Sequence, residues 1–296
     1  MRKLAAVLLI FAFIPFYSCR DSKEDEQEET GEEFIYEPYE EIEYVKRIFY
    51  ALPSPVETAF LLKSSGAVYD EELLSKTENS GNYLTTKSKA LNLGIYITDL
   101  SYVSFFDQTQ ESIRYMATVR ELAERMGVMD AVDNRTIERL EANLNNRDVV
   151  MDIISESYMR SSAFLSENRR DAIAAMVFTG GWVEGLYLAL NLADTGKNGG
   201  NGLVEHIAGQ KLSLDLLMRI LEENSHNSDV AELLEEMEKI YEVYGQMDAA
   251  STDLRLETGE DDKAVIVSDR EVSMTQSQLR ELKRRINGVR SSFVSY

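Results

Sequence analysis

The sequence predicts an all-α protein, a multi-helix bundle of antiparallel helices. The chain has 296 residues but only four prolines, one of which, Pro15, lies in an apolar leader. Leucine, glutamate, methionine and alanine are frequent, and these residues favour helix over strand. After Phe34, apolar residues recur with the helical period through most of the chain. The apolar content of 44% supports a packed core and excludes a wholly disordered chain.

Residues 1–18 are predicted to be a signal peptide. Arg2 and Lys3 precede an apolar run, Leu4–Phe16, that is too short for a comfortable membrane span. Cys19, the only cysteine, follows Ser18 directly. An unpaired thiol is a liability in an oxidising compartment, so a modified cysteine is expected here. The alternative is an ordinary secreted protein with one free cysteine.

A small residue followed by cysteine after such a leader resembles the lipobox of bacterial lipoproteins. The resemblance implies that cleavage leaves Cys19 as the first residue and that it carries acyl chains, palmitate among them. The protein would then contact the membrane through its N-terminal lipid. Retention in the inner membrane is associated with Asp after the cysteine, whereas this chain has Arg20. We therefore expect a cell outer membrane location, with the body facing the periplasm or the surface.

The lipidated cysteine opens an acidic tether, residues 19–33. Residues 20–33 contain eight acids, two bases and no large apolar side chain, so the segment should repel itself and stay extended. It is either an export signal, as in some surface-displayed lipoproteins, or a plain solvated spacer. The net charge of −21 disfavours nucleic acid as a partner and disfavours electrostatic attraction to anionic lipid.

Residues 34–296 are predicted to form one helical bundle domain. Tyr39–Leu52 is an amphipathic segment, and the sequence Pro53-Ser54-Pro55 then breaks the chain and restarts it as a helix, with Ser54 as cap. Its apolar residues are Ile42, Tyr44, Val45, Ile48, Phe49 and Leu52. Further helices are predicted over 70–76, 83–107, 110–126 (ended by Gly127), 134–144, 149–165, 171–193, 203–223, 230–247 and from Thr275, where Gln278 completes a capping box.

One stretch near the C-terminus looks extended instead. Leu254–Thr258 and Ala264–Val267 flank the acidic turn 259–262, a pattern compatible with one small β-hairpin. The glycine-rich loop 195–202 separates two helices. The last helix is rich in arginine and lysine, which we interpret as a surface that pairs with acidic neighbours.

Two helices are apolar on nearly all sides, and each carries one carboxylate. Leu91–Phe106 contains Asp99, and Ala172–Ala193 contains Glu184. Such helices belong in a core or a membrane, and the central Glu184 favours the core. Gly94, Gly180, Gly181 and Gly185 indicate close backbone packing between them, and a loose repeat around Gly94 and Gly180 hints at an internal duplication.

Carboxylates in these surroundings need hydrogen bonds, an ion pair or a proton. One interpretation is an aromatic-lined pocket in which the two acids bind a polar or cationic ligand; the other is a pair of structural acids that fix helix register. Arg114 and Arg169 are the candidate ion-pair partners. The candidate ligand-binding residues are Tyr96, Asp99, Tyr102, Trp182, Glu184 and Tyr187.

Other chemistry has little support in the sequence. Only two histidines are present, no Gly-x-Ser-x-Gly elbow occurs, and Gly196-Lys197 lacks the remainder of a phosphate loop. We therefore predict no metal, no cofactor and no enzymatic activity. The chain resembles helical lipoproteins of Gram-negative envelopes, which implies a binding or scaffold module with a protein partner or a small ligand. The alternatives are a structural or assembly factor of an envelope complex, and an enzyme that uses Asp99 and Glu184.

Overall fold

The computed structural model describes residues 55–128, 134–143, 146–167, 170–193, 200–247, 254–258, 264–268 and 274–295. The predicted signal peptide (1–18), the predicted tether (19–33) and the amphipathic segment Tyr39–Leu52 lie outside these residues. Pro38–Tyr296 forms one compact unit. The elements described below all belong to it.

The fold is an all-α bundle, as the sequence predicts. Its helices are α2 (Pro55–Ser64), α3 (Thr86–Phe105), α4 (Thr109–Met126), α5 (Asn134–Ala142), α6 (Arg147–Glu167), α7 (Asp171–Leu192), α8 (Gly200–Glu223), α9 (Ser228–Gly245) and α10 (Gln276–Val294). Two 3₁₀ segments, η1 (Glu71–Leu73) and η2 (Thr77–Asn82), connect α2 to α3. The predicted hairpin is confirmed: β1 (Leu254–Thr258) pairs antiparallel with β2 (Ala264–Ser268).

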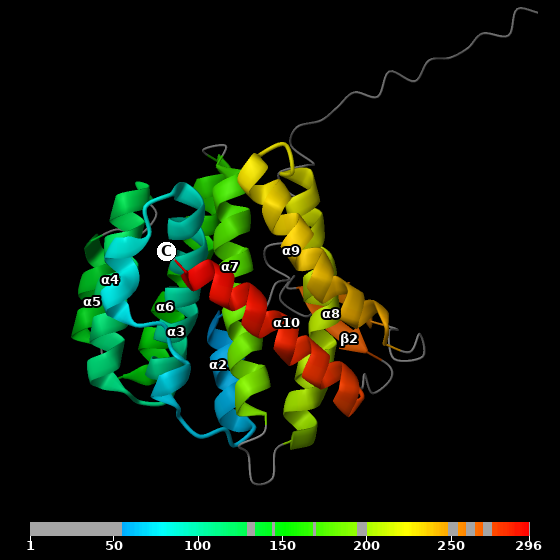
Figure 1. The fold of residues 1–296 in the computed structure, drawn as a ribbon. Helices are drawn as coiled ribbons and strands as arrows, with labels where there is room; N and C mark the ends of the chain where they lie inside the picture. The colour runs from blue at the N-terminus through cyan, green and yellow to red at the C-terminus, as the bar shows by residue number, and fades with distance from the viewer. Residues whose placement is uncertain are drawn as a thin grey trace, which may run out of the picture. The chain divides into compact units, whose positions relative to one another are not determined.

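Helix α7 is the centre of the bundle. It packs against α2, α3, α6, α8, α9 and α10, and α10 crosses its face on the way to the C-terminus (Figure 1). By length and composition α7 could cross a membrane, the one described helix of which this is true, but 89% of its apolar window is buried within the fold. It is therefore a core helix, and its apolar character reflects neighbours on every side.

The contact between α3 and α7 depends on glycine. A Cβ atom on Gly94 would lie 2.0 Å from the Val177 carbonyl oxygen, and one on Gly180 would lie 2.0 Å from the Leu91 carbonyl oxygen. Only a hydrogen in place of a side chain lets the two backbones approach this closely. The predicted close packing is confirmed for Gly94 and Gly180, whereas Gly185 faces Thr58 of α2 instead.

Helix ends follow local capping. Thr275 and Gln278 form the predicted capping box at the start of α10, and Gly127 ends α4 in the left-handed conformation at φ 64°. The predicted start of α3 at Tyr83 is wrong by three residues, because Thr85 and Ser88 form an unrecognised capping box. The predicted helix 70–76 is also wrong: only Glu71–Leu73 is helical, and the backbone is extended at Leu74.

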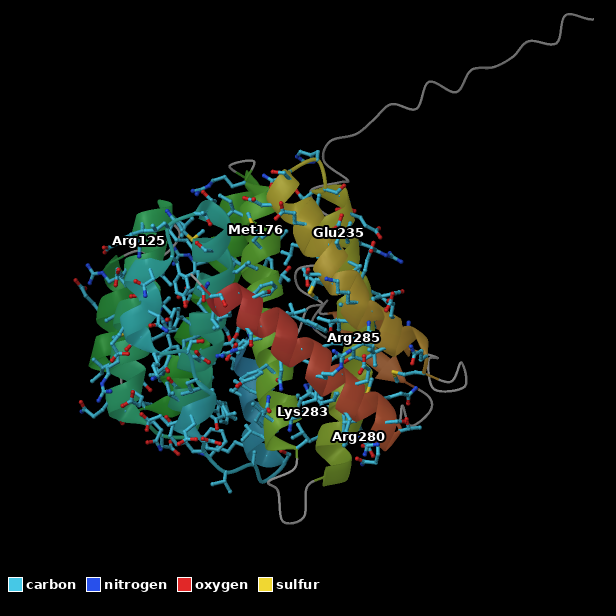
Figure 2. All side chains as sticks on the ribbon, in the orientation of Figure 1. Arg125, Met176, Glu235, Arg280, Lys283 and Arg285 are labelled. Atoms are coloured by element: carbon cyan, nitrogen blue, oxygen red, sulfur yellow. The ribbon has the colours of Figure 1, made fainter. Side chains whose placement is uncertain are left out.

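Two basic residues on the surface of α10 pair with acids as the sequence predicts. Arg284 and Arg285 both donate to Glu281, and Arg285 also reaches Glu242 of α9 at 2.7 Å. These hydrogen bonds lower the pKa of Glu281 to about 2. Figure 2 shows the basic side chains along α10, where it lies against α9.

Candidate functional site: a buried carboxyl pair

Asp99 of α3 and Glu184 of α7 meet in the core. Each lies one turn or more past the glycine contact on its helix, and both are 0% exposed. The Glu184 carboxylate lies close enough to Asp99 to raise the pKa of the Asp99 carboxyl group. Asp99 Oδ2 accepts a hydrogen bond from the Ser75 backbone N–H at 3.1 Å. The two acids therefore share one site.

Arg290 of α10 supplies the positive charge. Its Nε donates to Glu184 Oε2 at 2.9 Å and its Nη2 donates to Oε1 at 3.1 Å, which makes the pair bidentate. Nη2 also donates to the Ser75 hydroxyl at 2.8 Å and to the Leu73 carbonyl at 3.2 Å. The guanidinium lies 4.4 Å from the ring centroid of Tyr187, over its face. One side chain thus joins α10, α7 and the segment that follows η1.

The segment Leu73–Lys76 borders the site and contacts both Asp99 and Arg290. Two of its backbone carbonyls accept hydrogen bonds from surrounding tyrosines. Tyr115 donates to the Ser75 carbonyl at 2.9 Å, and Tyr96 donates to the Lys76 carbonyl at 2.7 Å. These contacts explain why the chain leaves helical geometry after Leu73.

The charges do not balance unless one acid keeps a proton. Burial and the neighbouring Glu184 carboxylate raise the pKa of Asp99 well above its usual range, against the lowering effect of Arg290 and of the Ser75 N–H. Asp99 Oδ1 is buried and accepts no hydrogen bond from the described residues. A proton on Asp99 accounts for both observations, because a protonated Oδ1 donates to Glu184. The site then holds one carboxylate, one neutral acid and one guanidinium.

This arrangement predicts a specific pH dependence. The folded pKa of Asp99 lies above its unfolded value, so its contribution to stability is complete below about pH 4 and is lost as the pH rises toward the folded pKa. Asp99→Asn cannot ionise, yet its amide can donate to Glu184. We therefore expect the variant to become progressively more stable relative to the native chain as the pH rises from 4 to 8.

Urea unfolding of both chains across this pH range measures the difference. Comparing the two chains cancels the titration of the other carboxylates, such as Glu281. A difference in unfolding free energy that does not change with pH would show that Asp99 is ionised in the folded state.

The structure brings together five of the six candidate ligand-binding residues. Tyr187 faces Arg290, and Tyr96 and Tyr102 belong to the aromatic layer beside Asp99. Burial raises the pKa of Tyr102 to about 12, and its hydroxyl accepts a hydrogen bond from the Asp70 N–H at 2.9 Å. Asp99 and Glu184 complete this group.

Trp182 lies apart from the carboxyl pair. Its indole Nε1 donates to the Ser213 hydroxyl of α8 at 3.0 Å, and the ring lines a hollow between α2, α7 and α8. It precedes Glu184 by two residues on a helix, so the two side chains point in different directions. The aromatic residues of the sequence prediction thus belong to two separate places.

The ion-pair partners expected from the sequence are not the ones used. Arg114 pairs with Glu111 on its own helix, and Arg169 lies outside the described residues. Arg290, Ser75 and Leu73, which carry most of the polar contacts, were not recognised as site residues. The sequence shows Arg290 within the basic helix, four residues after Ile286 and three before Phe293, at the edge of the apolar stripe.

The closed geometry limits what the pair can do. Asp99, Glu184 and Arg290 line none of three hollows on the described part of the chain: one between α2, α7 and α8, one between α2 and α8, and one beside α3, α9 and α10. A water-accessible acid with a raised pKa is a candidate catalyst, whereas a sealed one linked to three elements holds those elements in register. Among the described residues, no group of three or more His, Cys, Asp or Glu side chains is placed to hold a metal.

Known proteins offer no further guide. The chain matches no model of a protein family, no sequence of a curated protein and no solved structure at a significant level.

Proposed function

We propose that the protein is a lipid-anchored component of the bacterial cell envelope whose helical body acts as a binding or scaffold module. Acyl chains on Cys19 hold the chain at the outer membrane, and the tether 19–33 separates the body from the lipid. The protein partner is another component of the envelope. Two or more acyl chains give stable anchoring where one gives only marginal binding, so the lipid alone is a sufficient anchor.

The leader and the charge support the anchoring. Arg2, Lys3 and the apolar run lead directly to the single cysteine. Without the leader the chain carries a net charge of −23, that is −21 less the two positive charges of Arg2 and Lys3. A body this acidic is repelled by anionic lipid, so contact through its protein surface is disfavoured.

The sealed carboxyl pair is the observation that favours a scaffold over an enzyme or a ligand-binding module that would use these two acids. Asp99 and Glu184 are the acids that an enzyme or a cation-binding module would use, and both are fully buried against Arg290. A ligand would have to displace this ion pair to reach them. Because Arg290 links α7, α10 and the Leu73–Ser75 segment, the core is held rigid. A rigid body of this kind can present its outer surface to a partner.

The anchor is tested by substitution at the cleavage site. In Gram-negative cells, mass spectrometry of the mature N-terminal peptide is expected to find acyl groups on Cys19. Cys19→Ala should remove the acyl groups and release the chain from the membrane fraction, because no other strong membrane contact is expected. Ser18→Ala keeps a small residue before the cysteine and should remain acylated. An unmodified Cys19 thiol, or a Cys19→Ala chain that still fractionates with membranes, would contradict the proposal.

The role of the body is tested separately. A scaffold should keep its cross-linked envelope partners when Asp99 is replaced by Asn, since the fold and the outer surface are retained. An activity or ligand response that disappears in Asp99→Asn, while the variant remains folded, would favour the enzyme or the ligand-binding module instead.

A further inference from the structure

A groove with a mainly apolar lining is built from two helices of the described chain. It lies between α2 and α8 and has a volume of about 370 Å³. Glu57, Phe60 and Leu61 line it from α2; His206, Gly209, Gln210 and Ser213 line it from α8. These residues follow one another at helical i, i+3, i+4 spacing, so each helix presents a continuous ridge to the groove.

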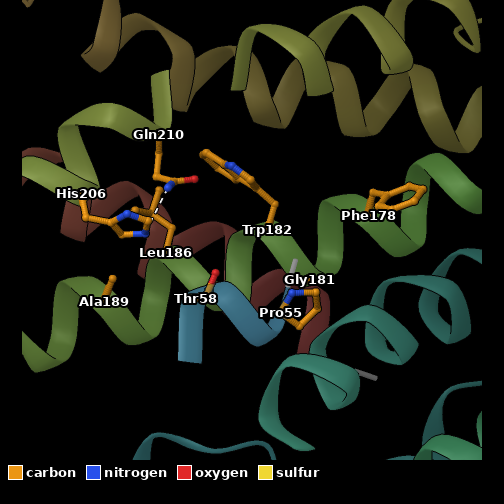
Figure 3. A pocket seen from close by; sticks show the side chains of 10 residues that line it. Pro55, Thr58, Phe178, Gly181, Trp182, Leu186, Ala189, His206 and Gln210 are labelled. Atoms are coloured by element: carbon orange, nitrogen blue, oxygen red, sulfur yellow. Dashed lines mark hydrogen bonds between the residues drawn. The ribbon is translucent and has the colours of Figure 1, made fainter. Parts of the chain in front are cut away.

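The groove continues inward into the hollow beside Trp182. His206 and Gln210 line both, and their side chains contact each other at 3.1 Å (Figure 3). Burial lowers the pKa of His206 to about 4, so the imidazole is neutral at physiological pH. The groove therefore offers an apolar surface with uncharged polar groups along α8.

Helix α2 has two apolar faces, of which the core uses one. Pro55, Thr58, Ala59 and Leu62 are buried. Phe60, on the groove side, leaves 54% of its surface exposed. A large aromatic exposed beside an open apolar groove indicates a surface that another element covers.

We propose that the chain's own segment Tyr39–Leu52 docks as an amphipathic helix in the groove between α2 and α8. Ile42, Val45, Phe49 and Leu52 recur at intervals of three, four and three residues, the spacing of one helical stripe. At 1.5 Å per residue the segment is about 21 Å long, against about 15 Å for α2, so it can cover the whole of α2.

The link between the segment and α2 fixes its direction. Pro53 and Pro55 disfavour helical geometry at Leu52 and Ser54, so the two helices cannot be continuous. A connection this short places the helices side by side and antiparallel. The described chain begins at Pro55, which itself lines the hollow that joins the groove. Pro55 thus lies beside a hollow that shares His206 and Gln210 with the groove.

Docking would set how far the body stands from the membrane, a consequence that rests on the proposed lipid anchor. With the segment free, Arg20–Ser54 could span about 120 Å at full extension; with it docked, Arg20–Pro38 spans about 65 Å. The groove would then act as the attachment point that shortens and orients the tether.

Hydrogen–deuterium exchange of the intact mature chain tests the docking, and it does so whatever group Cys19 carries. We expect the amides of residues 39–52 to exchange at least about tenfold more slowly than an unstructured peptide. Gly209→Phe should abolish this protection, because a Cβ at Gly209 has nothing within 4 Å and the ring beyond it would occupy the groove that Gly209 lines. Gly288→Phe, at an equally open helical glycine of α10, should leave it unchanged.

A second pair of variants changes the segment and leaves the groove intact. Phe49→Asp places a charge on the apolar stripe and should also remove the protection, whereas Tyr50→Asp, on the other face, should not. Free exchange of 39–52 in the native chain would overturn the proposal. So would protection that survives both Gly209→Phe and Phe49→Asp, since the segment would then pack elsewhere. Undiminished membrane anchoring alongside either result would leave the lipid assignment standing.

Discussion

Arg290→Met is expected to lower the free energy of unfolding by about 3–5 kcal/mol. The substitution keeps an unbranched side chain of similar length but removes the guanidinium from the bidentate contact with Glu184. Glu184 is 0% exposed and Arg290 only 13% exposed at the side chain, so no water replaces the lost hydrogen bonds. The Ser75 hydroxyl and the Leu73 carbonyl lose a donor at the same time. Urea unfolding followed by far-ultraviolet circular dichroism measures the loss.

The effect is specific to the buried position. Arg280→Met, on the exposed side of the same helix, should change stability by less than about 0.5 kcal/mol. Glu184→Gln in the Arg290→Met background should recover part of the loss, because it removes the unpaired charge. A loss below about 1 kcal/mol in Arg290→Met would mean that the ion pair contributes no more than an exposed one.

Gly94→Ala is expected to destabilise the protein by about 3 kcal/mol or more, although it adds only one methyl group. The added methyl group would lie 2.0 Å from the Val177 carbonyl oxygen and 2.6 Å from the Gly181 nitrogen. Both atoms belong to the backbone of α7, which cannot rotate away as a side chain can. The helices must separate, which disturbs the core around Asp99 and Glu184.

The same substitution at a helical glycine with open space around it should stabilise the protein instead. Gly288→Ala places its methyl group where no described atom lies within 4 Å, and alanine is the better helix former, so a gain of up to about 1 kcal/mol is expected. Thermal unfolding of the two variants gives the comparison. Equal changes in stability in the two variants would show that helix propensity determines the effect of Gly94→Ala, rather than the contact between α3 and α7.

The helical spacing of apolar residues predicted most of the fold, because apolar residues at that spacing mark the buried face of a helix. The ranges of α4, α7, α9 and α10 follow from apolar residues three and four apart, and their ends from Gly127 and from the capping box at Thr275. The error at 70–76 has a different origin. That segment is helical in composition, but its backbone groups bond to Asp99, Arg290 and tyrosines from distant parts of the chain.

The sequence predicted the two acids of the candidate site but not the arginine. Asp99 and Glu184 are conspicuous because each is the single charge in an apolar helix. Arg290 is not, because it is one of several basic residues in α10. Lys283 stands between Leu279 and Ile286 just as Arg290 stands between Ile286 and Phe293, so the pattern alone does not distinguish them.

The sequence by itself determined the helical class, and it indicated the glycine contact between two apolar helices, a small hairpin and two acids in apolar surroundings. The tertiary structure alone decided that the acids meet, that Arg290 pairs with Glu184, and that Trp182 lies apart from them beside a hollow between α2, α7 and α8. The physical reason is the distance along the chain over which each kind of interaction acts. Helix formation, capping and apolar periodicity act between residues a few positions apart, whereas the Arg290–Glu184 contact joins residues 106 positions apart and exists only when α7 and α10 cross.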